Sequence, residues 1–538
     1  MQIYNLKIIV IPINLKWKSK NVRRSWIMSE NSVFKTDKRI KLGVWGLGRG
    51  AYLVHQAKFL NIDVVAGCDI HPDMRECFAK NTPGAFVTAD EDEFLAQDFD
   101  AVLIATYFKD HAKHTIKALN AGKHVMCEVT AFHTPADGVK VVEAVEKSGK
   151  VYNLLENYPF TKENMYIRDL WQKGFFGEFM YGEASYLHEC RVLSYAYNTG
   201  LDGLPIEPGY HAHNWRSTLN THYYNTHSLG PIMNITGLRP VAVSATPCDV
   251  YLPGYLGKKG TVTPSIIKMN NGALMRNLMG CTTNDYHMEL RMWGTKASVE
   301  KINDLKIRVG ACGGGEMLKI APEISELQKL ADQAGHGGGD FWELYYFARE
   351  ILTGEPAPWN IYSAADVTLT GIMAVHSSLK DGEMVEVPDF RNKAVRDQYR
   401  NDDVYYGNAF DPENIFPEGH DPTLTGQFSE LMTKLYPKSN GSGLPTYNMA
   451  YDGMKIFDNI ADAEGKLRII SRVSRLIECL PTLADAIKTA RKIADSYPES
   501  LPGKMLYDVL DSVDCEKICN VEQTTAELRT WLENRHKI

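Results

Sequence analysis

The feature that most constrains this chain is a glycine-rich turn between an apolar strand and a helix. In IKLGVWGLGRGAYLVHQAKFL, which begins at residue 40, an apolar strand enters the motif GLGRGA and a helical pattern follows. Gly46 permits a tight turn, Gly48 lets the backbone approach a pyrophosphate, and Ala51 keeps the helix close to the strand. The helix N-terminus then faces the anion. This order predicts a doubly wound parallel sheet that binds a dinucleotide.

A second strand indicates which dinucleotide is bound. The run VVAGCDI ends at Asp69, 23 residues after Gly46. A carboxylate there can accept hydrogen bonds from a ribose diol and would repel a 2′-phosphate, so NAD is favoured over NADP. Arg49 and Gly50 complete the expected cofactor contacts of the turn. The alternative is a sheet of the same type that binds no cofactor.

Polar residues follow the next strand, in DAVLIATYFKDHAKHTIKALNAG, at the edge where ligands gather in open α/β sheets. Thr106, Tyr107 and His111 lie just beyond that strand. We expect all three to line the cofactor site. His111 and His114 could equally be solvated residues in the first turn of a helix.

Length and charge restrict the other classes of protein. A chain of 538 residues is too long for one core, which predicts two or three domains. The net charge of −7 argues against a nucleic-acid partner, because nothing opposes phosphate repulsion. Residues 1–39 hold nine Lys/Arg and two Asp/Glu, a balance of +7 that leaves −14 for the rest. No segment approaches the roughly 18 apolar residues of a membrane span.

The basic arm and the cysteines favour the cytoplasm. The arm is basic after its apolar run and lacks a small-residue cleavage site, so it reads poorly as a signal peptide. Met28 is an alternative start. The ten cysteines form no CxxC pair, as expected for reduced thiols.

The segments that follow resemble a known family. The order of strands and helices, continued by KVYNLLENYPFTKENMYIRDLWQKGFFGEFMYGEASYLHE, resembles the Gfo/Idh/MocA oxidoreductases over about residues 40–390. The resemblance implies a Rossmann domain followed by an α/β domain with a large open, mostly antiparallel sheet. We therefore expect a basic arm (1–39), a Rossmann domain (40–158), a substrate-binding domain (159–390) and a connector with a helical C-terminal extension (391–538).

One position departs from the family's dehydrogenases. The strand in GKHVMCEVTAF is followed by Glu128, Val129 and Thr130, where those enzymes usually carry Glu-Lys-Pro. Their lysine takes the proton from a sugar hydroxyl as hydride leaves. An Asp-x-x-x-His pair typical of them is also missing from HAHNWRSTLNTHYYNTHSLGPI. An ordinary sugar or inositol dehydrogenase is therefore not expected.

One branch, the NAD-dependent glycosidases typified by α-N-acetylgalactosaminidases, matches better. Its resemblance rests on Glu128-Val129, Glu156-Asn157, Asn214-Trp215-Arg216, the run from Tyr224 to Pro231, Tyr286, and the run HGGGDFWELYYFAREILTG. Asn225 and Thr130 stand where that branch has proline.

The branch resemblance implies hydrolysis through a temporary oxidation. NAD removes hydride from C3 of a glycoside, a base takes the C2 proton, and the C1 group leaves. Water then adds at C1 and the hydride returns to C3. One alternative is a dehydrogenase that releases a 3-ketosugar and NADH, with Tyr or His replacing the lysine. Another is a catalytically silent sugar- or NAD-sensing module.

The resemblance also assigns residues to the sugar and the nicotinamide. His227 and Tyr186 are expected to transfer protons, because His, and Tyr near a positive charge, titrate close to the working pH. The sugar is expected to bind to Tyr224, Tyr286 and Arg216. The cofactor is expected to lie beside Glu128, Val129, Asn157 and Trp215.

A metal site is the competing interpretation of one histidine-rich segment. His188, Cys190, His211, His213 and His222 fall within 35 residues, and mixed His/Cys ligands suit zinc. Their spacing matches no closed zinc pattern, and the implied reaction needs no metal. We therefore expect substrate-lining histidines and no metal.

No segment beyond residue 391 resembles the family. Apolar residues from Leu467 to Ile477 follow helical spacing, Pro481 interrupts it, and the spacing resumes at Leu483. ELRTWLENRHKI predicts a last amphipathic helix. These helices are expected to pack on the core or on another subunit. A homo-oligomer is expected, because the open sheet of this family usually packs against a partner.

Overall fold

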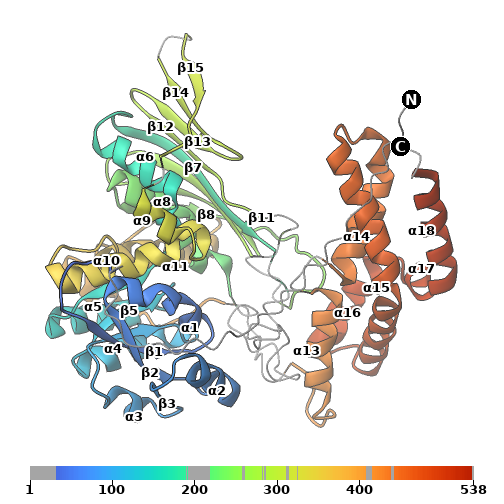
Figure 1. Cartoon of the computed structure of the whole chain (residues 1–538), viewed down its shortest axis with the longest axis horizontal. Helices are drawn as coiled ribbons and strands as arrows, with labels where there is room; N and C mark the ends of the chain where they lie inside the picture. The colour runs from blue at the N-terminus through green and yellow to red at the C-terminus, as the bar shows by residue number, and fades with distance from the viewer. Residues whose placement is uncertain are drawn as a thin grey trace, which may run out of the picture.

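The computed structural model of the chain has two sheets and a set of C-terminal helices (Figure 1). It describes residues 32–189, 191, 219–256, 261–281, 283, 286–310, 314–323, 325–407, 415–437 and 441–535. The architecture confirms the predicted α/β fold class with a helical C-terminal region. No described helix is both long enough and apolar enough to cross a membrane.

The first sheet has six parallel strands in the order β3-β2-β1-β4-β5-β6, the arrangement of a Rossmann fold. Its central strands are buried on both faces, which is why they read as continuous apolar runs. The strands are β1 (Ile40–Trp45), β2 (Ile62–Cys68), β3 (Phe86–Thr88), β4 (Ala101–Ile104), β5 (His124–Glu128) and β6 (Tyr152–Leu155). The helices are α1 (Arg49–Leu53), the 3-10 helix η1 (Val54–Leu60), α2 (Pro72–Asn81), α3 (Glu91–Leu95), the 3-10 helix η2 (Phe108–Asp110), α4 (His111–Asn120) and α5 (Pro135–Ser148).

The glycine turn has the geometry that its sequence predicts, with one change of role. Gly46 has φ +91°, and a Cβ there would lie 2.4 Å from the carbonyl oxygen of Ala105. Gly50, rather than Ala51, gives close packing of helix on strand, because a Cβ on Gly50 would lie 2.7 Å from Val44 Cγ1. The expected helix is also short, since α1 passes into η1.

The second sheet has ten strands, and β7 lies near its centre. The β7–β10 pair is parallel and the other described pairs are antiparallel, as predicted. The strands are β7 (Phe179–His188), β8 (Pro240–Ala245), β9 (Val262–Met269), β10 (Leu274–Gly280), β11 (Tyr286–His287), β12 (Leu290–Gly294), β13 (Ser298–Lys301), β14 (Leu305–Val309), β15 (Glu316–Lys319) and β16 (Val385–Glu386).

Helices cover one face of this sheet and join it to the first domain (Figure 1). Among them, α8 packs on β7 and β10, and α11 packs on both β8 and the Rossmann strand β6. The helices are α6 (Lys162–Gln172), α8 (Thr226–Thr236), α9 (Glu326–Ala331), α10 (Gly339–Thr353) and α11 (Ile361–Ser378), with 3-10 helices η3 (Tyr158–Phe160), η5 (Thr221–Tyr224) and η6 (His336–Gly338).

The segment after residue 391 divides between the two ends of the molecule. The first part, with α12 (Lys393–Arg396) and η7 (Asp397–Tyr399), packs on α5 of the Rossmann domain. There Arg396 binds Glu146 at 2.8 Å and Arg400 binds Glu143 at 2.6 Å. The later helices have a hydrophobic core of their own. They are α13 (Leu424–Leu435), α14 (Gly443–Ile456), η8 (Phe457–Asn459), α15 (Ala463–Ser496), α16 (Leu501–Asp511), α17 (Cys515–Cys519) and α18 (Val521–Arg535).

The expected interruption at Pro481 was wrong, because α15 continues through it for 34 residues. Proline removes one backbone hydrogen bond, but Pro481 lies on the exposed side of the helix. The neighbouring Leu480 and Leu483 are buried in the helical core and hold the two halves in line. We call residues 415–437 and 441–535 the helical unit.

Candidate active site

A cleft of about 2360 Å³ runs from the carboxyl edge of the Rossmann sheet to the end of β7 and the start of α8. Its first-domain wall contains Gly46, Gly48, Arg49, Asp69, Thr106, Tyr107, His111, Glu128, Val129 and Asn157. Its second-domain wall contains Tyr186, His188, Tyr224, His227 and His336. Most residues that the sequence singled out therefore share one cavity, although their assigned roles stay predictions.

The glycine turn fits a dinucleotide. The left-handed Gly46 holds the backbone where any Cβ would collide with Ala105. Asp69 braces the turn, because its carboxylate accepts hydrogen bonds from the Leu47 amide at 2.7 Å and the His71 amide at 2.8 Å. The carboxylate also faces the cleft, where the predicted ribose contact requires it.

His111 joins the ends of two Rossmann strands. Its Nδ1 lies 2.8 Å from the carbonyl oxygen of Thr130 and its Nε2 lies 3.1 Å from that of Thr106. Burial opposes protonation, but Cys127 and the two carbonyl oxygens outweigh it and raise the pKa of His111 to about 9. An imidazolium can donate to both carbonyl groups. His111 is therefore positioned to fix the loops that line the cleft, and it is itself almost fully buried.

An ionic network joins the glycine turn to α10. Arg49 donates from Nε to Glu128 at 2.9 Å and from Nη2 to Asp340 at 2.8 Å. Asn157 Nδ2 also donates to Asp340, at 3.0 Å. Burial opposes ionisation of Asp340, but hydrogen bonds from His336 and Arg49 outweigh it and hold its pKa well below its usual range. The predicted cofactor residues Arg49 and Asn157 thus meet at the buried Asp340 carboxylate, and Arg49 links it to Glu128.

A buried carboxyl group lies beside this network. Glu343, one turn along α10 from Asp340, is buried, and its oxygens have no hydrogen-bond partner among the described residues. Burial, together with the charges of Asp340 and Glu128, raises the pKa of Glu343 well above its usual range. Ionisation of Glu343 is therefore disfavoured at this position.

A buried carboxylate orients His227 at the second-domain wall. Nδ1 of His227 lies 2.9 Å from Oε1 of Glu156, which is fully buried and directly follows β6. The rings of Tyr158, Tyr186 and Tyr224 surround the imidazole at centroid distances of 4.6 to 4.8 Å. Glu156 thus fixes one ring nitrogen of His227, as the buried Asp fixes the imidazole in a Ser-His-Asp triad.

Tyr186 also has an imidazole partner. Its hydroxyl lies 2.9 Å from Nδ1 of His188, two residues further along β7. Tyr286, predicted to bind the sugar, lies on β11 with its ring 5.0 Å from that of His188. Its side chain is 64% exposed and it is not among the described residues that line the cleft.

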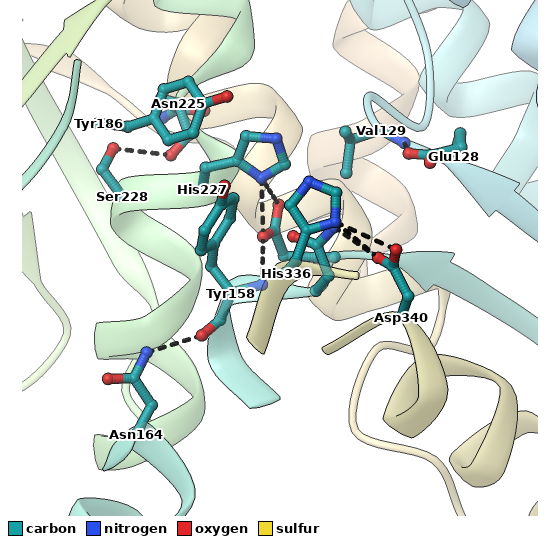
Figure 2. Close-up of polar contacts among 12 residues, drawn as sticks. Glu128, Val129, Tyr158, Asn164, Tyr186, Asn225, His227, Ser228, His336 and Asp340 are labelled. Atoms are coloured by element: carbon teal, nitrogen blue, oxygen red, sulfur yellow. Dashed lines mark hydrogen bonds and ion pairs between the residues drawn. The ribbon is translucent and has the colours of Figure 1, made fainter. Parts of the chain in front are cut away.

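His336 forms a second imidazole–carboxylate pair, which the sequence analysis did not single out. Its Nδ1 lies 2.9 Å from Oδ1 of Asp340, and its ring meets Tyr158 edge-on at 5.6 Å (Figure 2). The motif HGGGD could have revealed this pair, because its His and Asp are four residues apart. They stand in the reverse order of the Asp-x-x-x-His pair that is typical of the dehydrogenases. Glu156 and His188 were quoted in motifs, and only the fold showed that they contact His227 and Tyr186.

Some expected residues lie outside the described part of the chain. These are Arg216, Trp215, Cys190, His211 and His213. Of the histidine-rich segment, His188 bonds Tyr186, while His222 is fully buried and its burial lowers its pKa to about 3. Within the described ranges, no group of three His, Cys, Asp or Glu side chains is arranged to hold a metal ion.

Two family models match the chain. One is the oxidoreductase family with an NAD-binding Rossmann fold, Gfo/Idh/MocA, over residues 40–155. The other is the C-terminal domain of glycosyl hydrolase 109, over residues 322–397, which contain His336 and Asp340.

Known proteins show the same similarity. A glycosyl hydrolase family 109 protein of Stenotrophomonas maltophilia is 26% identical over 69% of this chain and 93% of its own. An alpha-N-acetylgalactosaminidase of Tannerella forsythia is 26% identical over 66% of this chain and 87% of its own. The fold is that of a levoglucosan dehydrogenase solved with NADH and levoglucosan, at a TM-score of 0.55 and 17% identity over 65% of this chain and all of that one. The chain therefore carries an NAD-binding Rossmann domain of the Gfo/Idh/MocA oxidoreductase family at residues 40–155, and it resembles glycosyl hydrolase family 109 proteins over about two thirds of its length.

Proposed function

We propose that the protein is an NAD-dependent glycosidase that cleaves a sugar glycoside by temporary oxidation at C3 and elimination across C1 and C2. The observation that carries the proposal is the placement of two imidazole–carboxylate pairs and a Tyr–His pair in the same cleft as the dinucleotide turn. Glu128-Val129 also matches the glycosidase branch, whereas the family's dehydrogenases usually carry Glu-Lys-Pro there.

The first-domain wall would hold the cofactor. Gly46 and Gly48 admit the pyrophosphate, Asp69 accepts the ribose hydroxyls, and Glu128 and Asn157 lie toward the second domain. When bound, NAD would supply a hydride acceptor that later returns the hydride to C3. While C3 is a ketone, the neighbouring C2 proton is acidic.

The second-domain wall would move the protons. Tyr186 is the proposed base for the C2 proton, because its hydroxyl already bonds His188, which can accept the tyrosine proton in turn. Glu156 stabilises a protonated His227 and fixes the ring through Nδ1, so Nε2 can exchange a proton with the sugar or the departing group. Tyr224 encloses the same space and is the proposed sugar contact.

The name of the Tannerella relative makes aryl α-N-acetylgalactosaminides the first substrates to test, within a panel of α- and β-glycosides. Purified protein is incubated with each glycoside in D2O without added NAD. Aglycone release with deuterium at C2, and no accumulation of NADH, is the expected result. Accumulating NADH with the aglycone still attached would instead identify a dehydrogenase. Inertness toward the whole panel with NAD retained would favour a sensing module.

A further inference from the structure

The His336–Asp340 pair has a distinct place in the cleft wall. The Asp340 side chain is only 2% exposed, whereas that of His336 is 35% exposed. Nδ1 of the imidazole is held by both carboxylate oxygens, at 2.9 and 3.1 Å. Nε2 has no hydrogen-bond partner in the described part of the chain, and His336 lines the cavity. The pair therefore presents one ring nitrogen to a ligand and keeps its carboxylate inside.

The loop that carries His336 is shaped around it. His336, Gly337 and Gly338 have φ values of +54°, +63° and +91°, in the left-handed region that non-glycine residues seldom adopt. A Cβ on Gly339 would lie 2.4 Å from the carbonyl oxygen of Asn157. Glycine is thus required for the loop to fit against Asn157. A non-glycine residue held left-handed in a cavity wall indicates a functional placement.

The pair is tied to the position of the missing lysine. Asp340 binds Arg49, and Arg49 binds Glu128, the residue immediately before Val129. Val129 and His336 line the same cavity. Both His227 and His336 contact the ring of Tyr158, but only His336 shares its carboxylate with this network, while His227 lies among the tyrosines (Figure 2). His336 is accordingly the imidazole on the cofactor side of the cleft.

We propose that Nε2 of His336 is the proton acceptor for the sugar hydroxyl that is oxidised, in place of the lysine missing at position 129. This inference rests on the proposed function and assigns one step of it. As C3 gives up hydride to oxidised NAD, the O3–H bond breaks, its proton goes to Nε2, and its electron pair forms the C3=O bond. Asp340 stabilises the imidazolium that results. The proton returns to O3 when C3 is reduced again.

The test separates oxidation from elimination. A 3-keto aryl glycoside is already oxidised, so its aglycone should leave without a proton acceptor for O3. In the full chain carrying NAD, His336→Gln should slow release from the ordinary aryl glycoside about 100-fold or more. Release from the 3-keto glycoside should stay within about threefold of the unmodified protein. Tyr186→Phe should lose both reactions, and His420→Gln, in the helical unit, should lose neither.

A binding measurement gives a readout independent of turnover. A 1,5-anhydro sugar has no leaving group, and its 3-deoxy counterpart lacks the hydroxyl in question. The unmodified protein should bind the hydroxylated ligand about tenfold more tightly, the value of one hydrogen bond to a polar partner. His336→Gln should lose most of this difference, with its NAD content unchanged.

The outcomes are distinct. If the unmodified protein releases aglycone from neither substrate, the proposed function fails. If it releases both and His336→Gln matches it on both, His336 is not the acceptor. If His336→Gln loses NAD, or loses both substrates equally, His336 holds the cofactor or the fold, and the inference is overturned.

Discussion

We call the part of the chain that carries the two sheets and the cleft, the described residues up to 407, the body. The body and the helical unit bury different kinds of residue. The body buries the paired carboxylates of Glu156 and Asp340 beside a large cavity. In the described residues of the helical unit, the buried polar side chains are Ser429, Thr446 and Thr524, and none is charged. Buried charge is costly unless it is paired, so its concentration beside a cavity indicates chemistry. The helical unit has an apolar core.

The sharpest test of this contrast is Gly46→Ala in the dinucleotide turn. The new Cβ would meet the Ala105 carbonyl oxygen at 2.4 Å, so the turn must move. We expect nearly complete loss of bound NAD and of glycoside cleavage, measured by cofactor release on denaturation and by aglycone release. Gly122→Ala is the matched control, because Gly122 has φ +77° but its Cβ would meet nothing within 4 Å. Equal NAD content in the two variants would show that the turn does not bind the cofactor.

Glu156→Gln tests the positioning of His227. The amide keeps the shape of Glu156 but no longer stabilises an imidazolium, so glycoside cleavage should fall about 10²- to 10⁴-fold. The pH profile of kcat should change with it, which loss of packing alone would not cause. Glu499→Gln, a highly exposed residue of the helical unit, is the control. An unchanged profile would show that Glu156 has only a structural role.

Leu483→Ala tests the independence of the helical unit. Leu483 is 1% exposed on α15, and its truncation should lower the free energy of unfolding of that unit by about 2–5 kcal/mol. Urea unfolding followed by helical circular dichroism measures the change, while cleavage at low urea should stay unaffected. Leu467→Ala on the same helix is the control, because Leu467 is 63% exposed. Loss of cleavage in Leu483→Ala would show that activity depends on the folding of the helical unit.

His111 gives the body a pH-dependent contribution to stability. A pKa raised from 6.5 to about 9 contributes stability that is complete below the unfolded pKa and is lost as pH rises through about 9. The loss should be on the order of 1–3 kcal/mol between about pH 6.5 and 9.5. His111→Gln should flatten this part of the stability curve, measured by urea unfolding with a Rossmann-domain fluorescence probe. If the free energy of unfolding of the variant fell with pH as steeply as that of the unmodified protein, another group would be responsible for the loss of stability.

The smallest expected effect concerns Tyr286, predicted from the sequence to bind the sugar. Its exposure of 64% and its place outside the lining of the cleft lead us to expect a change in KM below about threefold for Tyr286→Phe. Tyr224→Phe, which alters a residue of the cleft wall, is the comparison and should raise KM more. A larger effect for Tyr286→Phe would extend the substrate site to β11.

The sequence by itself determined the Rossmann domain, because strand, glycine turn and acidic strand end are local patterns. Gly46, Gly48 and Asp69 act within one supersecondary unit and can be read from their spacing. The absence of the dehydrogenases' lysine was also visible in a local pattern, Glu128-Val129-Thr130 after one strand. The continuity of α15 through Pro481 was misread, because burial of Leu480 and Leu483 outweighs one lost hydrogen bond.

Only the tertiary structure decided which side chains act together. Glu156 and His227 are 71 residues apart, and Arg49 and Asp340 are 291 apart, so no spacing rule connects them. Their pairing follows from packing α8 and α10 against the carboxyl edge of the first sheet, which also excludes water from the carboxylates. Burial and charge pairing arise from that packing, and they determine which of the many Tyr, His and Glu residues can take part in chemistry.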